Sequence, residues 1–434
     1  MQITLAQFRY LVDALTIVLP LTAPADVTLK HYFRNHAQLG QRDRAIVAET
    51  VYTVLRHRRL LEHLIPDGSP ARMALVALVR FAGLSNRELM HLVDKAETDW
   101  LNDLKAKDLS ALPFGVKVDL PDWVVERLRT SYRDDEILAL AQGLQNPAPL
   151  DLRVNILTTR REAVLEQFRR EGIACAPTPY SPNGIRLTGK ISLAKHPLFL
   201  SGQVEVQDEG SQLLGLLVDA RRGDMVADFC AGAGGKTLLL GAVMASTGRL
   251  YAFDVSEKRL ANLSPRLKRS GLSNITPQRI QSENDTKIKR LAGKLDRVLV
   301  DAPCTGLGTL RRNPDLKWRQ TSAGLAELNT KQSLILEAAG RLVKPGGRLI
   351  YGTCSLLREE NEDIIERFLE AHPEFVLSAV NPVFEKLKIS LKMPGPFLQL
   401  SPDRHGTDGF FAAVMERTTV PVKPTPAQSK HVDS

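Results

Sequence analysis

The stretch VADFCAGAGGKTLLL, Val226–Leu240, joins an apolar run, a glycine-rich turn and a second apolar run. The first run is typical of a buried strand, and the second is typical of a helix that begins directly after the turn. The Gly-Lys-Thr ending suggests a phosphate-binding loop, but that motif needs a glycine where Cys230 stands. The dinucleotide motif G-x-G-x-x-G fits Gly232 and Gly234 and fails at Thr237. The turn therefore serves another ligand, or none.

Length and composition place the chain in a broad class. Its 434 residues suggest two or three domains, and 43% hydrophobic with 25% charged residues is the composition of a soluble globular protein. No run approaches the ~20 apolar residues of a membrane span. The start, MQITLAQFRYLV, lacks the pattern of a secretory signal, so we expect a cytoplasmic protein. The net charge of +9 fits an anionic partner such as nucleic acid, although unrelated proteins share it.

Four cysteines stand at positions that form no C-x-x-C pair and match no zinc spacing, so we expect neither a metal site nor a disulfide framework. They are Cys175, Cys230, Cys304 and Cys354.

The composition and hydrophobic pattern of the sequence change at three points, which divide it into four regions. Residues 1–145 carry apolar residues at helical spacing, as in RDRAIVAETVYTVLRHRR, with arginines mostly off that stripe. Residues 146–205 contain short alternating runs such as LDLRVNI and QVEVQD around one helical segment, which predicts a small α+β module. Residues 206–417 form the third region. Residues 418–434 are polar and rich in proline, and we expect them to be disordered.

From Val226 onward, predicted strands and helices alternate. Runs such as DRVLVDA are apolar at consecutive positions, as a strand covered by helices on both faces must be. The pattern predicts a Rossmann-like, doubly wound α/β fold with a parallel sheet. The runs FVLSAV and GFFAAVME could add two strands at one end.

Three acidic residues follow successive predicted strands: Asp254, Asp285 and Asp301. Ligands of such sheets bind beyond the carboxyl ends of the strands, where the glycine turn also lies. Asp254 stands where a carboxylate can bind a ribose diol. Taken singly, each acid is better explained as a helix cap or turn residue, but together with the turn they favour a cationic nucleoside over a polyphosphate. S-adenosylmethionine fits this charge pattern.

Cys304 and Cys354 each follow an apolar strand, so both thiols should reach the edge where the cofactor binds. A thiolate that adds to carbon 6 of a pyrimidine makes carbon 5 nucleophilic toward a sulfonium methyl group, and a second thiol could assist release. Asp301 is placed to stabilise charge at ring nitrogen 3. Spacing does not decide which cysteine attacks; DNA cytosine methyltransferases use a Pro-Cys cysteine, which would favour Cys304.

The segments DFCAGAGGKT, DRVLVDAPCTGLGTLRRNPDLKW, GGRLIYGTCS and DGFF resemble the RsmB/NOP/Sun (Fmu) family of RNA cytosine-C5 methyltransferases over residues 205–417. The resemblance implies that Cys354, in Thr-Cys-Ser, is the nucleophile and that Cys304, in Asp-Ala-Pro-Cys, assists product release. Two departures are Ala233, where the family usually has proline, and the acid of the third strand, for which we choose Asp285 before Glu283. The implied contacts of S-adenosylmethionine are Cys230, Ala231, Gly232, Ala233, Gly234, Gly235, Lys236, Asp254, Asp285 and Asp301.

The N-terminal region, residues 1–145, is similar to the NusB-like helical RNA-binding domain of the bacterial RsmB branch. This resemblance implies small-subunit (16S) ribosomal RNA as the substrate. Beside Cys304, the segment GTLRRNPDLKW offers cations and an indole suited to flipped or single-stranded RNA. The RNA-contact candidates are Arg311, Arg312, Lys317 and Trp318; for Trp318 a purely structural role is equally plausible. Two alternatives stay open, a catalytically silent ribosome-assembly factor and a methyltransferase acting on a small molecule or protein.

Overall fold

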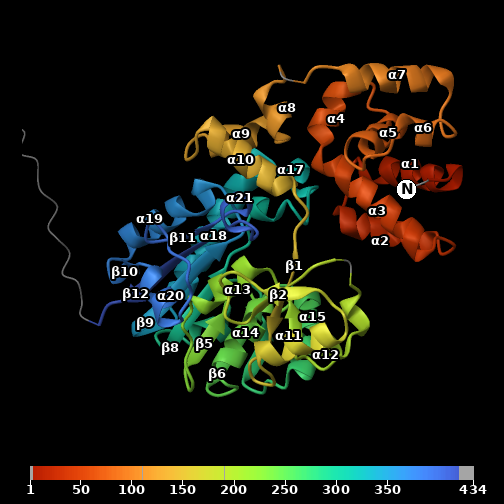
Figure 1. Cartoon of the computed structure of the whole chain (residues 1–434). Helices are drawn as coiled ribbons and strands as arrows, with labels where there is room; N and C mark the ends of the chain where they lie inside the picture. Colours follow the sequence, from red (N-terminus) through yellow and green to blue (C-terminus); the bar gives the residue numbers. More distant parts are fainter. Residues whose placement is uncertain (1–2, 110, 190, 420–434) are drawn as a thin grey trace, which may run out of the picture. The chain divides into compact units, whose positions relative to one another are not determined.

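A computed structural model describes residues 3–109, 111–189 and 191–419 (Figure 1). Most of the predicted tail, from residue 420 on, lies outside this range. By its internal contacts the chain divides into two compact units: Met1–Pro147 with Thr305–Leu325, and Ala148–Cys304 with Ala326–Ser434. In the described ranges, none of the helices combines the length and apolar character that crossing a membrane requires.

The N-terminal part of the first unit is helical, as predicted. In α3 the apolar residues Val47, Val51, Val54 and Leu55 recur at helical spacing, and all four are fully buried. The helices are α1 (Leu5–Val18), α2 (Ala25–Asn35), α3 (Gln41–Arg56), α4 (Arg58–Leu64), α5 (Pro70–Arg80), α6 (Asn86–Leu89), α7 (Lys95–Ala106), α8 (Phe114–Val118), α9 (Asp122–Leu128) and α10 (Asp134–Gln145).

Segment Thr305–Leu325, which carries α17 (Leu316–Arg319), packs with these helices rather than with the domain in which we expected it. The ammonium group of Lys317 donates to the carbonyl oxygens of Arg56 at 2.7 Å and Asp119 at 2.6 Å. The indole Nε1 of Trp318 donates to the Leu55 carbonyl at 2.7 Å. Since α3 ends at Arg56, the hydrogen bonds to the Leu55 and Arg56 carbonyls satisfy groups that have no partner within that helix.

The small α+β module is the first part of the second unit. Its sheet has the order β2-β3-β1-β4, with antiparallel neighbours. The prediction for this region missed the short strand β2 and the short helix α12. Its elements are β1 (Leu150–Val154), α11 (Arg161–Arg170), β2 (Cys175–Pro177), β3 (Gly184–Leu187), α12 (Pro197–Leu200) and β4 (Val204–Val206).

The main sheet confirms the doubly wound fold. Its order is β10-β12-β9-β8-β5-β6-β7, with β11 paired to β12. β5 pairs in parallel with both β6 and β8, so the chain reverses direction across the sheet at β5, beside the glycine turn. β10 and β12 are the two strands expected at one end, and β12 runs antiparallel to both β9 and β10. The strands are β5 (Met225–Asp228), β6 (Arg249–Asp254), β7 (Ile275–Arg279), β8 (Leu295–Asp301), β9 (Val343–Thr353), β10 (Phe375–Ser378), β11 (Leu398–Leu400) and β12 (Phe410–Arg417).

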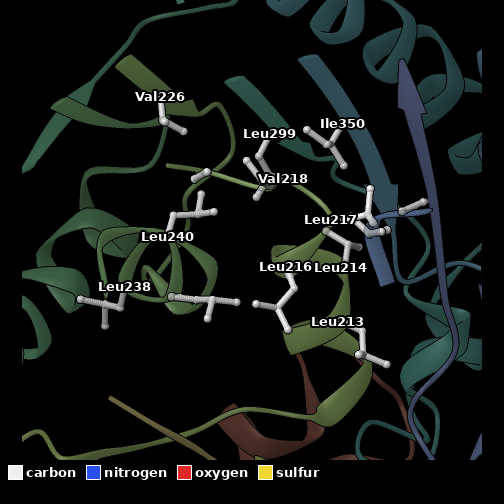
Figure 2. Packing of buried hydrophobic residues seen from close by; sticks show 14 of the residues in the cluster. Leu213, Leu214, Leu216, Leu217, Val218, Val226, Leu238, Leu240, Leu299 and Ile350 are labelled. Atoms are coloured by element: carbon white, nitrogen blue, oxygen red, sulfur yellow. The ribbon is translucent and has the colours of Figure 1, made fainter. Parts of the chain in front are cut away.

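Helices cover both faces of this sheet. Figure 2 shows leucines of α13 (Glu209–Leu216) and α14 (Gly235–Val243) gathered near Leu299 and Ile350 of the sheet. The alternate strand residues, among them Val298 and Val300, pack with α18 (Ser322–Gly340) and α19 (Glu362–Ala371) in a separate cluster. Burial of each of these leucine side chains stabilises the folded state by about 1.5–3 kcal/mol. The remaining helices are α15 (Glu257–Ser270), α16 (Thr286–Lys289), α20 (Asn381–Lys386) and α21 (Pro402–His405).

The indole hydrogen bond of Trp318 gives a test of its structural role. Trp318→Phe keeps an aromatic ring but leaves the Leu55 carbonyl without its donor. We expect the unfolding free energy of the helical unit to fall by about 1–3 kcal/mol, measured in urea by circular dichroism. An unchanged free energy would show that the segment is held by other contacts.

Candidate active site

The glycine turn connects β5 to α14 and needs glycine at two positions. Gly232 and Gly234 have φ angles of +55° and +83°, which residues with a side chain adopt at a cost. A Cβ atom on Gly234 would also lie 2.2 Å from Leu263 of α15, so a larger residue cannot fit there. A Cβ atom on Gly232 would meet only the Cys230 oxygen, at 4.0 Å. The turn is thus packed at Gly234 and open at Gly232.

Asp254, at the end of β6, accepts a hydrogen bond from this turn. Its Oδ2 accepts a hydrogen bond from the Gly232 backbone N–H at 2.9 Å, and its Oδ1 accepts one from the Ser256 N–H at 2.7 Å. Ser256 caps α15. The carboxylate is therefore fixed in orientation, and each oxygen keeps a lone pair for a ligand.

Asp301, at the end of β8, forms an ion pair with the lysine of the turn. The Lys236 ammonium lies 2.8 Å from its Oδ2 and 5.4 Å from the centre of the Phe410 ring, which belongs to the DGFF segment. Burial alone would lower the pKa of Lys236, but the Asp301 carboxylate outweighs it and the pKa is raised. Lys236 is therefore charged at neutral pH and balances one of the acids.

Asp285 has the role of a helix cap. Its carboxylate accepts backbone hydrogen bonds from Lys287 and Gln281, both at 2.9 Å, and these bonds lower its pKa. It precedes α16 and lies beside a shallow hollow lined by Arg279, Gln281, Ser282, Asn284, Asp285, Thr286 and Lys287. The alternative Glu283 accepts a hydrogen bond from the side chain of Asn284 at 2.8 Å. The cofactor contact of either acid stays a prediction.

The two cysteines of interest lie together. β8 and β9 are parallel neighbours with Asp301 opposite Gly352, so the residues that follow each strand emerge side by side. The sulfur atoms of Cys304 and Cys354 are 3.4 Å apart, and both residues are partly exposed. The pKa of Cys304 is raised well above its usual range, first by its hydrogen bond to Cys354 and then by burial. One sulfur donates a hydrogen bond to the other, and the raised pKa means that Cys304 holds its proton at neutral pH.

A buried polar network, which sequence reasoning missed, fixes the two loops that carry these cysteines. The Gln332 amide nitrogen, on α18, donates to the Pro303 carbonyl at 2.9 Å and to Glu360 Oε1 at 3.0 Å. The other oxygen of Glu360 accepts a hydrogen bond from the Ser355 hydroxyl. Glu360 and Gln332 are both 0% exposed. One carboxylate thus links the residue before Cys304 to the residue after Cys354.

Asp228, at the end of β5, is a second buried acid that was not predicted. The Thr237 hydroxyl donates to its Oδ2 at 2.7 Å, whereas Oδ1 is buried without a partner in the described protein. Burial raises its pKa to about 7. Its position directly before the turn was the only available signal, because burial of a carboxyl group cannot be read from sequence.

The other predicted site residues fall into two groups. Burial raises the pKa of Cys230 well above its usual range, which makes this thiol unreactive. Arg311 and Lys317 are buried in the first unit, at 6% and 3% exposure, and Arg312 and Trp318 are partly exposed there. Their RNA contacts stay a prediction. In the part of the chain that the structure describes, no group of three or more His, Cys, Asp or Glu residues could hold a metal ion.

The raised pKa of Asp228 predicts a pH effect on stability. An acid that holds its proton more tightly when folded makes the protein less stable as pH rises from its unfolded pKa of 3.8 to its folded value of about 7. Asp228→Asn removes this loss. We expect the difference in unfolding free energy between variant and wild type to grow by about 2 kcal/mol from about pH 5 to about pH 7. A difference that stays constant over this range would contradict the assignment.

The comparisons with known proteins agree with this geometry. Residues 215–416 match the family described as 16S rRNA methyltransferase RsmB/F, and residues 120–194 match the ferredoxin-like domain of RsmF/B-like methyltransferases. This second match begins in the helical region, earlier than the predicted module boundary at residue 146.

Relatives and a solved structure match over most of the chain. The probable ribosomal RNA small subunit methyltransferase B of Synechocystis sp. is 32% identical, over 90% of this chain and 95% of that protein. Ribosomal RNA small subunit methyltransferase B of Sodalis glossinidius is 33% identical, over 78% of this chain and 73% of that protein. The crystal structure of PH0851 matches with a TM-score of 0.78 at 26% identity, over 96% of this chain and 100% of that chain. The chain therefore belongs to the RsmB/F family of methyltransferases.

Proposed function

We propose that this protein transfers the methyl group of S-adenosylmethionine to carbon 5 of a cytosine in small-subunit ribosomal RNA, with Cys354 as nucleophile. The observation that carries the proposal is the pair of sulfur atoms 3.4 Å apart at the ends of β8 and β9. A single thiol suffices to attack a pyrimidine; a second one in contact with it is explained by a reaction that must also release the product. We place this activity in the cytoplasm, where thiols stay reduced.

The residues around the glycine turn fit the methyl donor. Asp254 has lone pairs left for a ribose diol, and the turn is open at Gly232. The carboxylate of Asp301 adds the negative charge that suits a sulfonium and an ammonium group, and the unpartnered Oδ1 of Asp228 is a further polar atom beside the turn. When bound, S-adenosylmethionine supplies an electrophilic methyl group; all other groups in the reaction belong to the protein or the RNA.

Cys354 begins the reaction by giving up its thiol proton to solvent and adding as a thiolate to carbon 6 of the cytosine. A carbon–sulfur bond forms, and the electron pair of the ring double bond makes carbon 5 nucleophilic toward the methyl group. Asp301 is assigned to ring nitrogen 3, where a proton stabilises the developing charge. The Lys236 ammonium, in contact with Asp301 at 2.8 Å, can supply the proton that the Asp301 carboxylate passes to the ring.

The hydrogen bond between the sulfurs explains how Cys304 can change its role. While Cys354 is free, this bond is the main cause that keeps the pKa of Cys304 high. Once Cys354 is bonded to carbon 6, it is a thioether and a much poorer acceptor, so this cause is lost. Cys304 can then give up its own proton to solvent, and the resulting thiolate is the base that takes the proton from carbon 5. The electrons of that C–H bond restore the ring double bond and expel the Cys354 thiolate.

We assign an RNA contact in segment 305–325 first to Arg312. It is partly exposed, whereas Arg311 and Lys317 are buried, at 6% and 3% exposure. A guanidinium group can contact RNA phosphates, and such contacts weaken as salt rises. Lys317 and Trp318 would hold the segment in place through their hydrogen bonds to backbone carbonyl groups.

The two cysteines predict opposite outcomes for their variants. Cys354→Ala should abolish methyl transfer from labelled S-adenosylmethionine to ribosomal RNA, because no carbon–sulfur bond can form. Cys304→Ala should let addition and transfer occur but block release, so that a protein–RNA adduct survives denaturant. Gel electrophoresis measures the adduct, and mass spectrometry of the peptide locates the bond.

Cys175→Ala is the matched control. Cys175 lies in β2, at the edge of the small module's sheet, and packs against that module's own core, so both transfer and release should be unchanged. An adduct that forms with Cys354→Ala and not with Cys304→Ala would reverse the two roles. Methylation at another base or another atom would refute the proposed reaction.

A further inference from the structure

The small module is joined to helix α15 by close backbone contacts. The Asn155 amide nitrogen, just after β1, donates to the carbonyl oxygens of Gly202 at 3.0 Å and of Ser270, the last residue of α15, at 2.9 Å. A Cβ atom on Gly202 would lie 2.1 Å from the Arg269 carbonyl oxygen. The module and the end of α15 therefore approach as closely as a residue without a side chain allows.

Glu205 of β4 extends this contact with two ion pairs. Its Oε2 lies 2.9 Å from a terminal nitrogen of Arg266, and its Oε1 accepts a hydrogen bond from Arg269 Nε at 3.0 Å. The side chain of Glu205 is only 5% exposed, and those of both arginines are 20% exposed. These pairs are thus screened much less than surface pairs and hold both guanidinium groups in place.

Two arginines reach from this interface to the glycine turn. Arg266 Nη1 donates to the Ala233 carbonyl oxygen at 2.6 Å. Arg153 of β1 is 2% exposed, and its Nη1 donates to the Gly235 carbonyl at 2.6 Å and to the side chain of Gln207. The two carbonyls belong to alternate residues of the turn, on either side of Gly234.

We propose that the small module is a working part of the methyl-donor site, with Arg153 and Arg266 as positioning residues for the glycine turn. The proposal rests on binding of S-adenosylmethionine at that turn. The turn contains two glycines with positive φ, and backbone of this kind loses much conformational freedom when a ligand fixes it. Charged hydrogen bonds to the Ala233 and Gly235 carbonyls fix the turn before the ligand arrives, so less affinity is lost on binding.

Arg269 offers a matched control for Arg266. Both arginines lie on α15, pair with Glu205 and are equally exposed. Arg266 also contacts the turn at Ala233, whereas Arg269 packs over the Phe199 ring of the module at 4.4 Å. If the substitutions only loosen the contact between the small module and α15, both variants should lose affinity for S-adenosylmethionine to the same extent. A specific effect on the turn should appear only when Arg266 is replaced.

The test measures the dissociation constant of S-adenosylmethionine by isothermal titration calorimetry on the full chain without RNA. We expect Arg266→Gln to weaken binding about tenfold, which corresponds to about 1.4 kcal/mol, and Arg269→Gln to change it less than twofold. Both variants should lower the melting temperature of the ligand-free protein by similar amounts. Equal affinities for the two variants would overturn the proposal.

Arg266→Lys covers the case in which Arg266→Gln does not fold. A single ammonium group cannot hold Glu205 and the Ala233 carbonyl in the arginine geometry, so binding should still weaken several-fold. Unchanged affinity would overturn the proposal. The cysteine chemistry is tested separately, because Cys354→Ala should bind S-adenosylmethionine as the wild type does while it fails to methylate RNA.

Discussion

The hydrogen bond between Cys304 and Cys354 is the interaction on which the proposed function of this protein depends. It exists because β8 and β9 are parallel neighbours whose ends emerge at the same edge of the sheet, with Asp301 opposite Gly352. It makes two chemically identical groups different, since it holds the pKa of the Cys304 thiol high, and in the proposed reaction Cys354 is left to react. In that reaction, Cys304 loses its hydrogen-bond partner once Cys354 bonds to the base. The same contact can therefore order the two steps of the reaction in time.

Around this pair, buried polar groups fix the positions of the loops that carry the cysteines. Apolar packing alone would not hold these loops at fixed distances. Glu360 and Gln332 link the loops of the two cysteines, and the Lys236–Asp301 pair joins the glycine turn to the end of β8. Such groups are costly to bury and strongly destabilising when only one partner remains. They are therefore well suited to hold loops at fixed distances. The small module contributes in the same way through Arg153, which reaches the turn from a neighbouring sheet.

Sequence reasoning predicted what depends on local pattern. Alternation of apolar runs gave the doubly wound sheet, and the position of Cys304 and Cys354 after two strands placed both thiols at one edge. It could not predict contacts made across long distances in the chain. Lys317 looked like a surface cation and is buried against α3, because only the fold brings residues 56 and 317 together. Asp285 was predicted as a cofactor contact with a helix cap as the alternative; its oxygens cap a short helix, and the cofactor contact stays a prediction. Glu360 gave no signal, since a buried glutamate and an exposed one look alike in sequence.

The most direct measurement of the central claim is the pH dependence of Cys304 alkylation by iodoacetamide, followed by mass spectrometry in wild type and in Cys354→Ala. If the hydrogen bond to Cys354 is the main cause of the raised pKa of Cys304, the midpoint of its reaction should move to clearly lower pH in the variant. Burial would still hold it above the value of a free thiol. A midpoint that is the same in both proteins would contradict the account, because the two sulfurs would then titrate independently.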